Sequence, residues 1–160
     1  MDKDLKESKL FTPYKLGPVT LRNRTIRSAA FESMGKDFGP TQKLKDYHVS
    51  VARGGIGMTT LAYASINRSG VSFNSQLWLR PEIVPALRDI TDAIHAEGAA
   101  AGIQIGHCGN MTHWSTAGCP GFSFARCSLL GCLCHLSSFW TRGDKNNIIV
   151  NCLFLMTINE

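Results

Sequence analysis

Up to about residue 120, segments with the apolar pattern of a strand alternate along the chain with segments that have the apolar pattern of a helix. Residues 25–30 form a short strand candidate, and residues 57–66 form a longer one that is rich in small and β-branched side chains. Residues 100–105 are a continuous apolar run, as in strands buried on both faces. A helix is predicted in each interval between these runs. The order strand, helix, strand, helix, strand predicts parallel β-α-β units in an α/β fold.

Two amphipathic helices are predicted between the strands. The first follows Gly39-Pro40 with Thr41 as its N-cap and ends at Gly54-Gly55. Its apolar stripe, at positions i, i+3, i+4 and i+7, comprises Leu44, Tyr47, His48 and Val51. The second helix opens at Pro81, and Gly98 stands where a C-cap belongs. One side of this helix carries Val84, Leu87, Thr91 and Ile94.

The two ends of the chain lack this periodicity. Residues 1–9 form a polar N-terminal tail without the apolar core of a secretory signal, and Thr12-Pro13 and Gly17-Pro18 indicate a turn-rich entry. After Pro120 a run rich in Cys, Leu and Ser leads into an apolar run over 148–158, and no cap or turn organises either run. We therefore expect a folded unit over 10–119 and an irregular, unrelated tail over 120–160.

Composition and charge exclude several classes of protein. A chain of 160 residues with 44% hydrophobic and 18% charged residues has the length of one globular domain and is not disordered or fibrous. The net charge of +5 comes from scattered basic residues, so no nucleic-acid surface is predicted. Apolar runs are too short for a membrane span. We expect a cytoplasmic protein, whose apolar tail would lead it to chaperones or aggregates if the chain misfolds.

Cysteine usage predicts neither a disulfide scaffold nor a metal site. Four of the six cysteines lie in the last 40 residues, and the sequence lacks the secretory context that disulfide-rich domains need. A zinc site is not predicted because these cysteines and the nearby histidine show no Cys-x-x-Cys spacing and no second ligand pair. The residues concerned are Cys127, Cys132, Cys134 and His135.

Several short sequence motifs occur in a characteristic order and spacing. They are Leu10-Phe11-Thr12-Pro13, Leu16-Gly17, Leu21-Arg22-Asn23-Arg24 and Gly102-Ile103-Gln104-Ile105-Gly106-His107-Cys108-Gly109. Together they resemble the N-terminal part of the old yellow enzyme family, the NADH:flavin oxidoreductases that include the 2,4-dienoyl-CoA reductases. The resemblance implies a TIM (β/α)8 barrel with FMN at the C-terminal mouth of its strands. Since only about three of eight strands are found, we expect a partial barrel and a truncated, spliced or frame-shifted chain.

The function implied by the resemblance is FMN-dependent redox chemistry. Hydride would pass from NAD(P)H through FMN to a small molecule, an activated alkene or similar acceptor. The phosphate-binding loops, the substrate-polarising pair and the proton donor belong to later strands of the family's barrel, so no catalytic residue is assigned here. The alternative is a non-enzymatic product: an unstable or merely flavin-touching fragment that is inactive alone.

The resemblance also implies cofactor contacts on each of the three strands. Ser28, Ala29 and Ala30 lie where the family's backbone runs along the flavin, and small side chains suit close approach to a flat ring; a plain buried strand end is the alternative reading. Ala62 and Tyr63 end the second strand near the pyrimidine side of the flavin, although many relatives carry a small residue in place of Tyr63.

Gln104 interrupts an apolar strand, where a buried amide needs hydrogen-bond partners. Its donor and acceptor match a ring carbonyl and the neighbouring N–H of the flavin. The alternative is a core glutamine satisfied by the backbone.

Two histidines complete the list of candidates. His107 and Asn110 show the His-x-x-Asn spacing with which some family members hold substrate. That pair comes from a later strand in the family, so the spacing here is interpreted as a chance match. His107 is expected to support the loop at the mouth of the barrel, and His107 and His113 are assigned to its substrate side.

Overall fold

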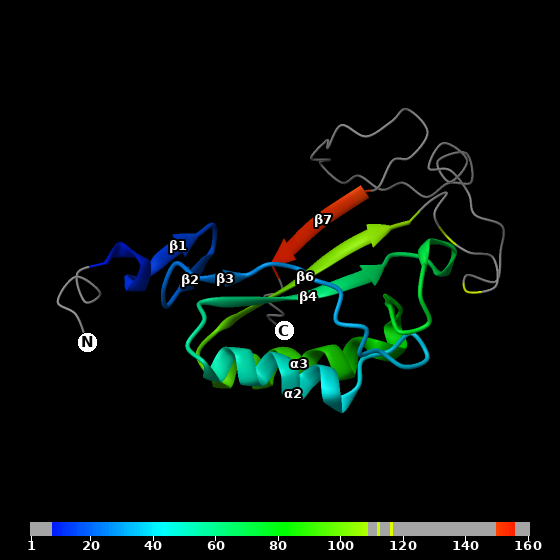
Figure 1. The fold of residues 1–160 in the computed structure, drawn as a ribbon, viewed down its shortest axis with the longest axis horizontal. Coiled ribbons are helices and arrows are strands. Elements are labelled where there is room, and N and C mark those ends of the chain that lie inside the picture. Colours follow the sequence, from blue (N-terminus) through cyan, green and yellow to red (C-terminus); the bar gives the residue numbers. More distant parts are fainter. Residues whose placement is uncertain (1–7, 109–111, 113–115, 117–149, 156–160) are drawn as a thin grey trace.

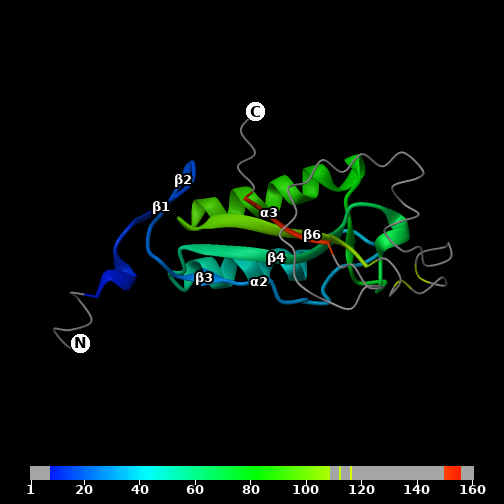
Figure 2. The same cartoon turned by 90° about the horizontal axis from the view of Figure 1, so that it is seen from above.

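The structure, a computed structural model, describes residues 8–108, 112, 116 and 150–155. A mostly parallel sheet forms one layer, and two helices pack together across one of its faces (Figure 1). Seen from above, both helices run alongside the strands (Figure 2). The predicted order of strands and helices is confirmed, and the parallel strands form an open sheet rather than a closed barrel within the described part of the chain.

Three parallel strands build the centre of the sheet in their order along the chain. They are β3 (Ile26–Arg27), β4 (Met58–Ser65) and β6 (Ala100–His107). A short fourth strand, β5 (Leu77–Trp78), adds to the C-terminal end of β4 in parallel. β3 is shorter than the predicted run over 25–30. The Arg27 guanidinium donates to the Thr60 carbonyl at 2.8 Å, next to the point where the β3–β4 ladder stops.

Helix α2 (Gln42–Arg53) begins as predicted, with the Thr41 hydroxyl accepting a hydrogen bond from the Leu44 amide at 3.3 Å. The chain leaves this helix through Gly54 and Gly55, and Gly55 adopts a φ of +97°. The buried face comprises Leu44, His48 and Ala52. Tyr47 and Val51, predicted on the same stripe, are only half-buried, because α2 turns its Leu44–His48–Ala52 line toward the sheet.

Helix α3 (Val84–Ala96) starts after a single 3-10 turn, η3 (Pro81–Ile83), so the predicted start at Pro81 belongs to that turn. Gly98 has a φ of +76° just beyond the helix end, as a glycine at this position often does. The buried face comprises Leu87, Ile90, Thr91 and Ile94. Val84 is 45% exposed, because the first residue of α3 lies at the edge of the helix–sheet layer.

One apolar core fills the space between the sheet and the two helices. It includes residues from every layer: Leu44, Ala52, Leu61, Ala64, Leu77, Ile83, Leu87, Ile90, Ile94, Ala99, Ala101 and Ile103. Burial of these side chains is the main force that holds the helices against the strands.

The turn-rich entry predicted near the N-terminus contains regular structure. A 3-10 turn, η1 (Lys9–Phe11), precedes a hairpin of β1 (Tyr14–Leu16) and β2 (Val19–Leu21). The two-residue connection, Gly17-Pro18, has a φ of +57° at Gly17, as short hairpin loops require at this position. The strands are only three residues long, so their alternation is too brief to predict from sequence.

The segment over 120–160, expected to be irregular, contains one strand in its described part. β7 (Val150–Leu155) pairs antiparallel with β6, from Gly102 opposite Leu155 to His107 opposite Val150. The edge of β6 away from β4 offers unpaired backbone groups, which an apolar extended segment can satisfy. Residues 117–149 and 156–160, including Cys127, Cys132, Cys134 and His135, lie outside the described residues, so the domain division at residue 120 stays a prediction.

The described residues contain neither a helix that could span a membrane nor a side-chain cluster that could hold a metal ion. None of the helices in these ranges is long and apolar enough to cross a membrane. No group of three or more His, Cys, Asp or Glu side chains in the same ranges is arranged to hold a metal ion.

Candidate functional site

The pairing of β4 with β6 is irregular near their C-terminal ends. Leu61 pairs with Ile103 and Ala64 with Ile105, so two residues of β4 oppose one residue of β6. This is the arrangement of a β-bulge. The two β4 residues are Ala62 and Tyr63, and the β6 residue is Gln104. Three of the predicted site residues are thus side by side in the sheet.

Gln104 lies on the sheet face away from the helices. Its neighbours Ile103 and Ile105 pack into or against the core beneath the helices, and successive side chains of a strand point to opposite faces. The Gln104 side chain is half-buried, and its amide makes no hydrogen bond with another residue in the part of the chain that the structure describes. Within the described residues, no backbone group satisfies this amide, and the role of Gln104 at a cofactor stays a prediction.

Ser28, Ala29 and Ala30 follow β3 and run beside β4. Ser28 and Ala30 are exposed and Ala29 is half-buried, so the alternative of a plain buried strand end does not describe this segment. Gly102, which pairs with Thr60, leaves the neighbouring part of β6 without a side chain. Small residues therefore flank the part of the sheet that contains Gln104, and small side chains beside an amide fit a planar ring with hydrogen-bonding edges.

Aromatic side chains gather beside the bulge. The Phe31 ring centroid lies 5.3 Å from that of Tyr63 and 5.1 Å from that of Phe73. The Cys108 thiol lies 3.9 Å from the Tyr63 hydroxyl. Burial, reinforced by Cys108, raises the pKa of Tyr63 to about 12. Tyr63 is therefore a protonated phenol at neutral pH, able to donate as well as accept a hydrogen bond.

Alkaline titration provides a test of this environment. We expect the absorbance change of the Tyr63 phenolate, isolated by subtracting the titration of Tyr63→Phe, to have a midpoint of about 12 rather than 10.0. Because the folded-state pKa is raised, Tyr63 stabilises the fold fully below pH 10.0, and this contribution disappears as the pH rises toward 12. Cys108→Ala is expected to lower the midpoint only in part, because burial remains the larger cause. A midpoint near 10.0 in the intact chain would contradict the burial of the phenol.

His107 contacts the loop that follows β4. Its Nε2 lies 3.1 Å from the Ser69 hydroxyl, in the 3-10 turn η2 (Arg68–Gly70). A Cβ on Gly70 would lie 2.5 Å from the His107 ring, so this close approach requires glycine. Burial lowers the pKa of His107 and favours the neutral imidazole. The assignment to the substrate side stays a prediction, and His113 and Asn110 lie outside the described residues.

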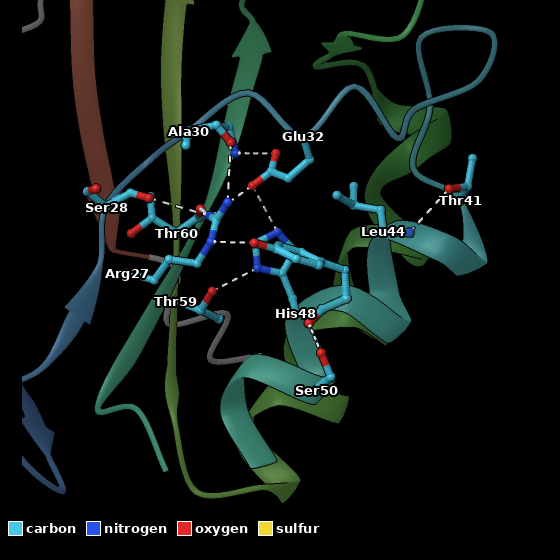
Figure 3. Close-up of polar contacts among 12 residues, drawn as sticks. Arg27, Ser28, Ala30, Glu32, Thr41, Leu44, His48, Ser50, Thr59 and Thr60 are labelled. Carbon is cyan, nitrogen blue, oxygen red and sulfur yellow. Dashed lines mark hydrogen bonds and ion pairs between the residues drawn. The ribbon is translucent and has the colours of Figure 1, made fainter. Parts of the chain in front are cut away.

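A buried polar cluster beneath the Ser28–Ala30 segment was missed by sequence reasoning. The Glu32 carboxylate lies 2.9 Å from an Arg27 guanidinium nitrogen and 3.3 Å from His48 Nε2 (Figure 3). The other ring nitrogen of His48 lies 2.8 Å from the Thr59 hydroxyl. The side chains of Glu32 and His48 are 2% and 0% exposed.

The sequence held one weak signal for this cluster. His48 stands on the predicted apolar stripe of α2 and Arg27 stands inside a predicted strand, so both polar side chains occupy positions that face other elements. Buried charges need partners, which should have prompted a search for an acidic residue nearby. Glu32 gave no signal of its own, because it lies in an irregular segment between β3 and α2.

Comparison with known proteins relates the chain to oxidoreductases. Residues 9–119 match the NADH:flavin oxidoreductase / NADH oxidase family. The chain is 44% identical over 100 residues to the 4,4'-dithiodibutanoate disulfide reductase of Rhodococcus erythropolis, a match that covers 62% of this chain and 25% of that protein. It is 40% identical over 106 residues to the NADPH dehydrogenase of Listeria welshimeri, a match that covers 64% of this chain and 31% of that protein.

Solved structures share the fold. The old yellow enzyme homologue from Zymomonas mobilis superimposes with a TM-score of 0.64 at 24% identity, over 70% of this chain and 32% of that one. The chain therefore spans about a quarter to a third of the length of these relatives. The likeness covers the part of the chain that contains the parallel strands and both helices.

Proposed function

Because the chain belongs to the NADH:flavin oxidoreductase / NADH oxidase family, we propose that its three parallel strands form one side of an FMN site. The activity that we propose for the complete protein is NAD(P)H-dependent reduction of an activated alkene or a similar small-molecule acceptor, for which FMN would be the redox cofactor. The single observation that supports this most is the bulge that sets Ala62 and Tyr63 opposite Gln104. We place this chemistry in the cytoplasm, where NAD(P)H is available.

The chain's own residues would bind and orient the cofactor. When bound, FMN supplies the ability to accept a hydride and to give it up again. The Gln104 amide offers one donor and one acceptor to a ring edge, and the small residues Ser28, Ala29 and Ala30 let the backbone approach the ring closely. Ala62 and Tyr63 border the same surface. A protonated Tyr63 hydroxyl can donate a hydrogen bond there.

These residues contact one side of a ring, so we also propose that the 160 residues do not oxidise NAD(P)H by themselves. The described parallel strands form an open sheet, whereas a barrel of this type closes with eight strands around its site. The 160-residue chain incubated with FMN should carry flavin absorbance through size exclusion while showing no NAD(P)H consumption. Steady NAD(P)H oxidation by this chain would overturn the proposal of inactivity, and a peak without flavin would count against the FMN site.

Removing the Gln104 amide provides the sharper test of the site. Gln104→Met keeps the length of the side chain but loses its donor and acceptor, so we expect the Kd for FMN to rise about 10-fold. Equilibrium dialysis or quenching of flavin fluorescence measures this change. Gln42→Met is the matched control, because Gln42 lies exposed on α2 and donates a hydrogen bond to the Asp46 carboxylate at 2.7 Å. Equal affinities for Gln104→Met and the unmodified chain would show that Gln104 does not face the ring.

A further inference from the structure

The two oxygens of the Glu32 carboxylate have different partners. Oε1 faces the Arg27 guanidinium at 2.9 Å and His48 Nε2 at 3.3 Å. Oε2 accepts a hydrogen bond from the backbone amide of Ala62 at 3.1 Å. Glu32 therefore joins a buried charge cluster to the first residue of the β4 bulge.

The bulge explains why the Ala62 amide needs such a partner. Regular pairing between β4 and β6 stops at Leu61 and resumes at Ala64, so the residues between them lie outside the ladder. A backbone N–H that is buried without an acceptor is costly, and Ala62 is only 6% exposed. Glu32 supplies the acceptor from a different segment of the chain and thereby holds the bulge in place.

Arg27 holds the neighbouring segment from the same cluster. Its guanidinium donates to the Ser28 carbonyl at 3.4 Å and to the Ala30 carbonyl at 3.3 Å (Figure 3). Its Nε also donates to the Tyr47 hydroxyl at 3.1 Å, which ties the segment to α2. The proposed cofactor contacts of β3 and of β4 are therefore held by one set of side chains.

Stability alone does not account for a buried charge cluster. Burying a carboxylate and a guanidinium costs solvation free energy that their attraction only partly returns, and apolar side chains of similar size often serve as well. What apolar side chains cannot do is accept the Ala62 N–H or donate to the carbonyls of Ser28 and Ala30. The feature specific to this cluster is thus its control over backbone position.

We propose that Glu32, held by Arg27 and His48, is a positioning residue that sets the Ala62 amide and the Ser28–Ala30 backbone at the surface where FMN binds. This inference rests on the proposed FMN site and assigns to it a supporting cluster. Glu32 acts through the backbone it holds and does not itself contact the ring.

The test replaces the whole ion pair so that no buried charge is left alone. In the 160-residue chain, Arg27→Met/Glu32→Met removes the hydrogen bonds to Ala62 and Ala30 while it keeps side-chain volume. We expect the double variant to remain folded, to bind FMN about 10-fold more weakly, and to change the visible circular dichroism of bound FMN. Hydrogen exchange of the Ala62 amide, measured by NMR without FMN, should become faster.

A control separates positioning from general loss of stability. Leu87→Ala creates a cavity under α3, far along the chain from the cluster, and should lower the thermal midpoint while leaving the circular dichroism of bound FMN unchanged. Unchanged Ala62 exchange in the double variant would overturn the inference, and so would an unchanged FMN spectrum and affinity. If the unmodified chain does not bind FMN, the proposed function fails, and the exchange of Ala62 alone decides whether the cluster holds the bulge.

Discussion

Replacing Ile103 by alanine is expected to lower the free energy of unfolding by about 2–5 kcal/mol. Ile103 is 0% exposed in the middle of β6 and belongs to the core between the sheet and the helices. The substitution removes buried methyl and methylene groups and leaves a cavity that a close-packed core fills only in part. Urea unfolding of the 160-residue chain, followed by far-ultraviolet circular dichroism, measures the loss.

The matched control is the same substitution at Ile26. This side chain lies on β3 of the same sheet but is 47% exposed, so Ile26→Ala should cost much less than Ile103→Ala. The comparison keeps the residue type and the strand environment and varies only burial. Equal costs for the two variants would contradict the placement of the core on the helix side of the sheet.

Replacing Arg22 by methionine is expected to lower the free energy of unfolding by about 2–3 kcal/mol. The guanidinium donates to the Ile56 carbonyl at 2.9 Å, to the Glu97 carbonyl at 2.7 Å, and also to the Ala52 carbonyl. The Ala52 and Glu97 carbonyls lie at the C-terminal ends of α2 and α3, where a positive charge is favourable, and the Ile56 carbonyl lies in the segment between α2 and β4. Methionine keeps the aliphatic stem but satisfies none of them. Urea unfolding again measures the change.

Arg53→Met serves as the control for charge. Arg53 forms an ion pair with the Glu97 carboxylate at 2.7 Å, but its side chain is 70% exposed, and exposed pairs contribute little. Both variants remove one arginine near the same residue, so net charge is matched. Arg22→Met should be clearly less stable than Arg53→Met, and a reversed order would show that the helix ends do not depend on Arg22.

Local signals were sufficient to predict most of the described fold. Thr41 as N-cap, Gly54-Gly55 and Gly98 as helix ends, and the apolar run over 100–105 all lie where the structure uses them. These signals work because caps and helical periodicity involve residues close together in the sequence. The hairpin of β1 and β2 was missed because its strands are too short to show alternation.

The candidate site was predictable only in part. Gln104 could be identified because an amide in an apolar strand is unusual, and the family resemblance added Ser28–Ala30, Ala62 and Tyr63. The position of Ala62 and Tyr63 opposite Gln104 could not be derived from the sequence, because the β4 bulge depends on how β4 pairs with β6. The contact between Glu32 and His48 likewise depends on α2 packing against the sheet.

The sequence by itself determined the order of β3, α2, β4, α3 and β6, the C-terminal ends of both helices and the family to which residues 9–119 belong. The tertiary structure alone decided which face Gln104 presents, how the Ala62 amide is satisfied and where β7 pairs. The physical reason is the separation along the sequence of the residues that interact. Capping and periodicity are satisfied within a few neighbouring residues, whereas strand register and the burial of charges depend on contacts between segments far apart in the chain.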